Sequence, residues 1–248
     1  MFICGKAKLD GKFLLMRKFL TAKWHDLVMA NYAVAPELLE NRVPRGTTLD
    51  FHDGKCFVSL VAFMFLDTRV LGIPVPFHIN FEEVNLRFYV KRETETETKR
   101  GVVFVKEIVP RFAIATVARL FYGEPYEAWR MSHQKTSREL IYAWWKRDDA
   151  HHIKVAIGAN TGVPTENSHG EFIIEHYWGY TKRGANRTDE YKVEHPKWEL
   201  FEIKNYEIKC DFGKLYGAEF NFLKDAKPHS IFMAKGTEVS VYKGEKIL

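Results

Sequence analysis

The chain has 248 residues and a formal net charge of +5, and its lysines and arginines are scattered rather than gathered in one run. Such a weak, dispersed charge favours solubility over a nucleic-acid-binding surface, so we expect no nucleic-acid partner. No apolar run approaches the roughly 18 residues that a bilayer-spanning helix needs. The apolar residues 13–16 are followed by two basic residues. We therefore expect neither a membrane segment nor a signal peptide.

The cysteines, histidines and glycines offer no motif for a metal or a cofactor. The three cysteines form no CxxC pair, which is typical of reduced thiols in a cytoplasmic protein. The adjacent His151 and His152 would face opposite sides of a strand, and the chain has no HExxH motif or Cys/His quartet. The glycine-containing segment 158–162 is neither a GxGxxG motif nor a Walker loop. We predict no metal and no cofactor.

In chain order, the pattern predicts many strands and few short helices. Helices are expected where apolar residues recur at helical spacing or a capping residue opens the segment, at 13–23, 36–41, 111–122 and 168–180. Strands are expected where apolar and polar residues alternate or apolar residues form short runs, at 48–51, 55–66, 81–90, 101–109, 129–136, 138–147, 150–158, 188–195, 198–210, 229–234 and 237–243. Asp53-Gly54 predicts a hairpin turn between the first two strands.

These elements define the expected fold class. Hydrophobic residues make up 46% of the chain, enough for a sizeable core, and no linker or low-complexity tract interrupts it. We predict a single domain over residues 1–248, with 1–10 as a loose leader. Its class is α+β, mainly β, with an antiparallel sheet large enough to curl into a barrel or cone.

The strand expected at 81–90 has one face of polar and charged side chains. Its residues alternate strictly, so the apolar side chains point one way and four polar ones the other: Glu83, Asn85, Arg87 and Tyr89. An antiparallel sheet with one solvated face gives the same pattern. The alternative is that the polar face lines an internal pocket. Both interpretations stay open on periodicity alone.

Arg119 is the second notable residue, because the helix expected at 111–122 is otherwise apolar. A guanidinium on a packed helix needs a carboxylate partner, and Glu83 is our first choice, with Glu175 the second. One interpretation is a structural ion pair that ties the helix to the sheet. The alternative is a pocket in which Arg119 receives an anionic ligand. Tyrosines extend the set of candidate polar residues, at Tyr122, Tyr126 and Tyr177.

Several of these segments resemble a known family. The chain is similar, from about residue 20 to about residue 217, to the bacterial YqjF-like domain-of-unknown-function family (number 2071). The most specific shared pieces are the Glu-x-Asn-x-Arg-x-Tyr strand at 83–89 and the Ala-Arg … Pro-Tyr segment at 118–126. Further pieces are 24–27, 31–39, 175–177 and 195–198. That family resembles the acetoacetate decarboxylase superfamily, a mainly β, cone-shaped double barrel around an internal cavity. The resemblance implies that the polar face of strand 81–90 points inward.

The resemblance also indicates what this chain lacks. Acetoacetate decarboxylases use a Gly-x-Pro-Lys-Lys segment, in which one lysine forms a Schiff base with the keto acid. This chain keeps Gly123 and Pro125 but has Tyr126-Glu127 at the two lysine positions. Glu83 matches the assisting glutamate of those enzymes. Lys106 stands where the YqjF-like family usually has serine, so it is no evident replacement for the nucleophile.

Three functions remain compatible with the sequence. The main one is a cytoplasmic protein that holds a small organic molecule, either anionic or neutral, in an internal cavity without Schiff-base chemistry. The second is a lyase- or hydrolase-type enzyme with Glu83 as the catalytic acid or base. The third is a non-catalytic structural or interaction protein, and a homo-oligomer is compatible with all three. The candidate ligand-binding residues are Asn85, Arg87, Tyr89, Arg119, Tyr126 and Glu175.

Overall fold

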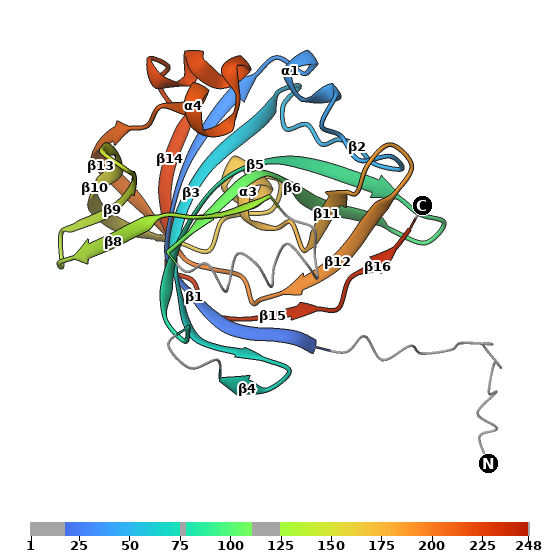
Figure 1. Ribbon diagram of the computed structural model, residues 1–248, viewed down its shortest axis with the longest axis horizontal. Coiled ribbons are helices and arrows are strands. Elements are labelled where there is room, and N and C mark those ends of the chain that lie inside the picture. Colours follow the sequence, from blue (N-terminus) through green and yellow to red (C-terminus); the bar gives the residue numbers. More distant parts are fainter. Residues whose placement is uncertain (1–17, 75–77, 111–124, 248) are drawn as a thin grey trace.

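The computed structural model describes residues 18–74, 78–110 and 125–247, and strands dominate them (Figure 1). The strands of the first half are β1 (Lys18–Val34), β2 (Thr48–Leu49), β3 (Cys56–Val70), β4 (Ile73–Pro74), β5 (Phe81–Glu93), β6 (Thr98–Val109), β7 (Tyr126–Ala128) and β8 (Arg130–Lys135). Those of the second half are β9 (Glu139–Lys146), β10 (Asp149–Gly162), β11 (Trp178–Lys182), β12 (Thr188–Glu194), β13 (Leu200–Lys209), β14 (Ser230–Ala234), β15 (Glu238–Tyr242) and β16 (Glu245–Lys246).

The helices of the described chain are short: α1 (Glu37–Glu40), α3 (His169–Ile174), α4 (Phe212–Tyr216) and a 3-10 helix (Ala218–Lys224). Helix α3 begins as predicted, because the side chain of Ser168 accepts a hydrogen bond from the backbone N–H of Glu171. It is shorter than predicted, since the chain from Trp178 onward pairs as strand β11. The helix predicted at 111–122 lies outside the described residues, as does the leader 1–10.

The helix predicted at 13–23 is wrong for its described part, residues 18–23, which belong to β1. These residues pair on both sides, with Thr21 opposite Ser240 of β15 and Arg69 of β3. Sheet pairing of this kind overrides a local apolar spacing that resembles a helix. The turn at Asp53-Gly54 is confirmed, because both residues have positive φ angles of 48° and 73° and His52 pairs with Lys55 across it. The predicted hairpin beyond that bridge does not form, because β2 pairs with β5 rather than with β3.

Seven strands close into a barrel. Neighbouring strands run in the order β3-β5-β6-β11-β12-β15-β1, and β1 pairs back onto β3 along most of its length. The pairings are mainly antiparallel, as predicted, but β6 pairs in parallel with β11 and with β7. Parallel neighbours need a long crossover rather than a hairpin, and the chain between β6 and β11 supplies one.

A second layer packs on the outside of this barrel. Strand β1 continues through β14, β13 and β10 to the β8–β9 hairpin, which projects to the left in Figure 1. The apolar face of β5 meets this layer: Leu86 and Phe88 are fully buried, in the same cluster as Trp144 of β9 and Phe212 of α4. The polar face of β5 points into the barrel. Both faces of β5 are therefore covered, and the solvated-face interpretation does not hold.

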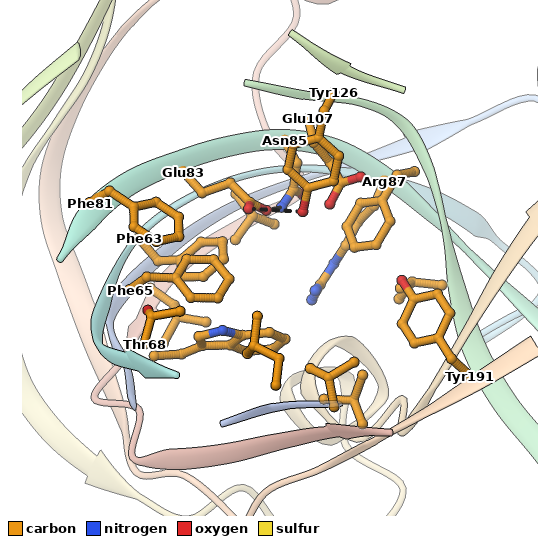
Figure 2. Close-up of a pocket in the computed structure, with 18 of the residues that line it drawn as sticks. Phe63, Phe65, Thr68, Phe81, Glu83, Asn85, Arg87, Glu107, Tyr126 and Tyr191 are labelled. Carbon is orange, nitrogen blue, oxygen red and sulfur yellow. Dashed lines mark hydrogen bonds between the residues drawn. The ribbon is translucent and has the colours of Figure 1, made fainter. Parts of the chain in front are cut away.

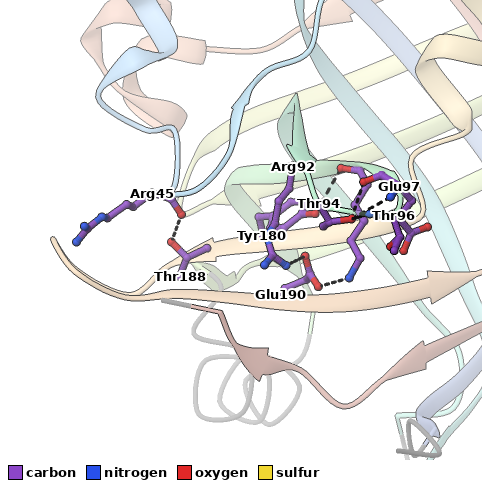
Figure 3. A network of polar contacts seen from close by, with 9 residues as sticks. Arg45, Arg92, Thr94, Thr96, Glu97, Tyr180, Thr188 and Glu190 are labelled. Carbon is purple, nitrogen blue, oxygen red and sulfur yellow. Dashed lines mark hydrogen bonds and ion pairs between the residues drawn. The ribbon is translucent and has the colours of Figure 1, made fainter. Parts of the chain in front are cut away.

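One rim of the barrel is tied together by a buried ion network (Figure 3). The carboxylate of Glu190 on β12 is 1% exposed. It lies 3.0 Å from Nη1 of Arg92 and 2.7 Å from Nζ of Lys99, at the β5–β6 hairpin. Two cations therefore neutralise this carboxylate where β12 meets that hairpin. No helix of the described chain is long and apolar enough to cross a membrane.

Candidate functional site

The barrel strands line a cavity of about 180 Å³ (Figure 2). An apolar cavity of about 150 Å³ is large enough to hold benzene, so this one accommodates a molecule of roughly one aromatic ring with a short substituent. Most of its wall is apolar, and the rings of Phe65 and Phe81 stack with centroids 4.6 Å apart. Other apolar residues of the wall are Trp24, Leu27, Val61, Phe63, Phe104, Trp178, Val193 and Val241.

Polar side chains gather on one part of the wall, where three neighbouring strands carry them in register. Asn85 on β5 pairs with Glu107 on β6, and Glu107 pairs with Tyr126 on β7. Glu83 lies next along β5 and accepts two hydrogen bonds, from Asn85 Nδ2 at 2.9 Å and from the Tyr126 hydroxyl at 3.2 Å. Both glutamates are 2% exposed. This part of the wall therefore holds two buried carboxyl groups beside the phenol of Tyr126.

Glu107 reaches the cavity because β6 contains a bulge. The pairing with β5 shifts by one residue between Phe104 and Lys106, so Val105 and Lys106 both face away from the cavity. Lys106 instead contacts Glu127, with Nζ 2.7 Å from Oε1. Regular alternation along β6 would have placed the lysine inside and the glutamate outside, so the sequence pattern missed Glu107.

The carboxyl group of Glu83 is protonated more readily than an ordinary glutamate. Burial raises its pKa to about 7, against the opposing effects of its hydrogen bonds to Asn85 and Tyr126 and the charge of Arg87. Burial and the neighbouring glutamates raise the pKa of Tyr126 well above its ordinary value, so the phenol keeps its proton at neutral pH. This part of the wall can hold and exchange a proton near neutrality.

Arg87 reaches into the cavity from the middle of β5 (Figure 2). Its Nη2 donates to the carbonyl of Ile173 at 3.3 Å, and its guanidinium carbon lies 5.7 Å from the centroid of the Tyr89 ring. Among the described residues, no carboxylate lies within ion-pair distance of this guanidinium. Its Nε is buried without a hydrogen-bond partner in that part of the chain. The cation is therefore incompletely compensated.

Two residues that we did not select from the sequence complete the site. His176, which follows α3, lines the cavity, and its Nε2 lies 3.2 Å from Oδ2 of Asp50. The same oxygen accepts from Nε of Arg100 at 2.7 Å. No local pattern predicts the Asp50–His176 pair, because its members are 126 positions apart.

The other predicted site residues take different positions. Tyr89 is buried on the inward face of β5, but its hydroxyl lies 2.7 Å from Ser59 Oγ and it does not line the cavity. Glu175 caps α3 and accepts a hydrogen bond from Tyr177, also outside the cavity lining. Arg119, and with it the predicted ion pair, lies outside the described residues. The structure thus brings together Glu83, Asn85, Arg87 and Tyr126.

Buried polar atoms without a partner concentrate around the cavity. Within the described chain, five cavity-lining residues carry a buried nitrogen or oxygen with no hydrogen bond: Trp24 Nε1, Thr68 Oγ1, Asn85 Oδ1, Arg87 Nε and His176 Nδ1. Buried polar groups are normally satisfied, so such a cluster is typical of a site that receives a polar molecule. No group of three or more potential metal ligands occurs in the described ranges.

Comparison with solved structures defines the class of fold. The chain is similar to acetoacetate decarboxylase from Legionella pneumophila subsp. pneumophila str. Philadelphia 1, with a TM-score of 0.66 and 11% identity over 93% of this chain and 87% of that one. It is also similar to the enduracididine biosynthesis enzyme MppR, with a TM-score of 0.66 and 11% identity over 96% and 91% of the two chains. The protein therefore has an acetoacetate-decarboxylase-like fold, as the sequence predicted.

The family is equally clear. Residues 21–238 match the domain-of-unknown-function family 2071, described as an uncharacterized conserved protein, and the chain belongs to this family. It is 26% identical over 209 residues to the uncharacterized protein YqjF of Bacillus subtilis (strain 168), covering 83% of each chain. The predicted family membership is confirmed.

Proposed function

We propose that the cavity binds a small organic acid, with Arg87 holding its carboxylate and the aromatic wall holding its apolar part. The observation that carries this proposal is the Arg87 guanidinium, which reaches into the cavity without a carboxylate partner among the described residues. Arginine does not lose its proton in proteins, so a buried guanidinium is stabilised by an anion. A ligand carboxylate would supply two acceptors in the geometry that a guanidinium prefers.

The size and the apolar surface of the cavity limit which ligands fit it. The stacked Phe65 and Phe81, with Phe63 beside them, offer an apolar surface to a ring or a short chain. A volume of about 180 Å³ matches a molecule of about the size of a substituted single ring. MppR, which shares the fold, has been solved in complex with pyruvate, a small carboxylate. That likeness of fold supports a small acid in this cavity without identifying it.

Binding of phenylacetate, measured by calorimetry beside its neutral analogue phenylacetamide, tests this proposal. Arg87→Met should weaken phenylacetate binding by about tenfold or more, because a charge-assisted hydrogen bond is worth about 1.5–3 kcal/mol. Arg130→Met is the matched control, since Arg130 is an exposed arginine stacked on Trp145 of the neighbouring strand. Equal affinity for phenylacetate in Arg87→Met and the wild type, or equal affinity of the wild type for the acid and the amide, would contradict the proposal.

The proposed site does not use imine chemistry. No lysine lines the cavity among the described residues, and Lys106 is engaged by Glu127 on the other side of the sheet. Treating the protein with acetoacetate and borohydride should therefore leave its mass unchanged. A trapped adduct on a lysine inside the barrel would overturn this part of the proposal.

A second candidate function, proton-transfer catalysis on such an acid, is favoured by Glu83. Its carboxyl group faces the cavity and its pKa is raised by burial to about 7, so it can donate and accept a proton near neutral pH. We expect the protein to exchange the methyl hydrogens of pyruvate with D2O, and Glu83→Gln to abolish this exchange. Lack of exchange with the wild type would favour a binding protein. The cavity itself weighs against a purely structural role, for which a filled barrel is expected.

A further inference from the structure

His176 presents one ring nitrogen to Asp50 and the other to no protein group among the described residues. Its side chain is 1% exposed, and its Nδ1 is buried without a hydrogen-bond partner in that part of the chain. The residue lines the same cavity as Arg87. A buried, unpartnered nitrogen in a cavity wall is a place where a ligand atom would complete the hydrogen bonding.

The Asp50 carboxylate fixes which nitrogen carries the proton. Burial opposes its ionisation, but hydrogen bonds from His176 and Arg100 lower the pKa of Asp50 to about 2. An ionised carboxylate only accepts hydrogen bonds, so the proton of the neutral imidazole lies on Nε2. Nδ1 of His176 therefore carries a lone pair and acts as an acceptor.

This nitrogen is an acceptor rather than a base. Burial and the positive charges of Arg100 and Arg87 lower the pKa of His176 to about 4, against the hydrogen bond to Asp50. A group that weakly basic does not take up a proton at neutral pH. It stays neutral and accepts a hydrogen bond from a donor that keeps its own proton.

The imidazole of His176 and the guanidinium of Arg87 contact the same ring, that of Tyr89. Arg87 donates to the carbonyl of Ile173, three residues before His176 in the chain. The ring of Tyr89 links the two, with its centroid 5.7 Å from the guanidinium carbon and 4.7 Å from the imidazole centroid. Both residues also line the same cavity, so a ligand held by Arg87 would have its carboxylate on the part of the wall that includes His176.

We propose that His176 Nδ1 accepts a hydrogen bond from a hydroxyl group next to the carboxylate of the bound acid, so that the ligand class is a 2-hydroxy acid. This inference rests on the proposed function, because Arg87 must hold the carboxylate. A hydroxyl fits better than an ammonium group, since Arg87 and Arg100 already place two positive charges near the imidazole.

The test compares two probes that differ by one hydroxyl, mandelate (each enantiomer) and phenylacetate. Wild-type protein should bind one mandelate enantiomer about tenfold more tightly than phenylacetate, the value of one well-made hydrogen bond to a buried acceptor. In His176→Gln this preference should disappear while phenylacetate binding persists. His151→Gln is the matched control, because His151 is also a buried histidine but lies on β10, where its ring stacks with Trp144 and does not line the cavity.

The outcomes separate this inference from the proposed function. Arg87-dependent binding of both acids with no preference for mandelate overturns the role of His176 and leaves the carboxylate site intact. A preference for mandelate that persists in His176→Gln also overturns the role of His176 and leaves the carboxylate site intact. Failure of every acid to bind overturns both proposals.

A second measurement keeps the inference testable if His176→Gln does not fold. Nitrogen NMR of the wild-type imidazoles, with His176 assigned from its contacts with the Tyr89 and Phe172 rings, reports the position of the proton. We expect protonated Nε2 and unprotonated Nδ1, and a change in the Nδ1 signal on addition of mandelate but not of phenylacetate. A proton on Nδ1 in the free protein overturns the inference.

Discussion

Two buried glutamates of this barrel differ in what surrounds them. Glu190 at the rim has two cations within 3.0 Å, from Arg92 and Lys99. Glu83 in the cavity wall is equally buried, but its direct partners are an amide and a phenol, and burial raises its pKa to about 7. The same residue type thus joins strands in one region and provides an exchangeable proton in the other. Neutralisation by a cation, rather than depth of burial, distinguishes the two.

The largest effect is expected at the rim. Glu190→Gln leaves Arg92 and Lys99 without their anion, although both cations keep some access to solvent, with side chains 28% and 15% exposed. We expect a loss of about 3 kcal/mol in the free energy of unfolding. Urea unfolding measures it, with Glu194→Gln on the exposed side of β12 as a control that should stay near the wild-type midpoint. If Glu190→Gln unfolds at the wild-type urea midpoint, the ion network does not stabilise the fold.

Glu83→Gln should raise the free energy of unfolding above neutral pH, whereas Glu190→Gln lowers it. The native state binds this proton more tightly than the unfolded chain, so the stability that it contributes is full below about pH 4.5 and is lost as pH rises through about 7. The variant has no carboxyl group at this position and so does not lose this stability. Its free energy of unfolding should exceed that of the wild type by about 2 kcal/mol at pH 8. Taking the difference between variant and wild type removes the titration of the buried histidines. A difference that does not vary between pH 5 and 8 would contradict the raised pKa.

Asp50 lies between these extremes, with one cation and one neutral imidazole as partners. Its pKa is lowered to about 2, so its contribution to stability is present above about pH 3.8 and is lost as pH falls through about 2. We expect Asp50→Asn to cost about 1.5 kcal/mol at pH 7, after allowance for the partly exposed Arg100. Thermal unfolding at pH 7 and pH 2 measures both points, and a cost that remains unchanged at pH 2 would be inconsistent with an ionised Asp50.

The smallest effect is expected on the outside of the second layer. Lys214 contacts Asp149 at 3.3 Å, with side chains 67% and 60% exposed. Ion pairs in this setting contribute little, because water and salt screen them. Lys214→Met should unfold at the wild-type urea concentration within error. A clear shift would mean that proximity of charge, and not burial with neutralisation, decides stability in this protein.

Periodicity predicted the inward face of β5 because that strand pairs with β3 without interruption from Phe81 to Phe88, so Glu83, Asn85 and Arg87 all face the cavity. It could not predict Glu107, because the bulge in β6 depends on how two strands pair and leaves no mark in the alternation of one. The pair of Asp50 and His176 could not be predicted for another reason: its members are 126 positions apart and are brought together only by the tertiary fold. The fold class followed from strand content and family resemblance, whereas the 13–23 helix was wrong because pairing with β3 and β15 decides that segment.

The bulge at Val105 has a consequence for how such a protein changes over time. If β6 paired with β5 without it, Lys106 would face the cavity and Glu107 would turn towards the apolar layer. An amine would then replace an acid in the wall without any change of residue identity. An insertion or deletion of one residue in this strand therefore exchanges a carboxyl group for an amine in the cavity wall, although no other residue changes.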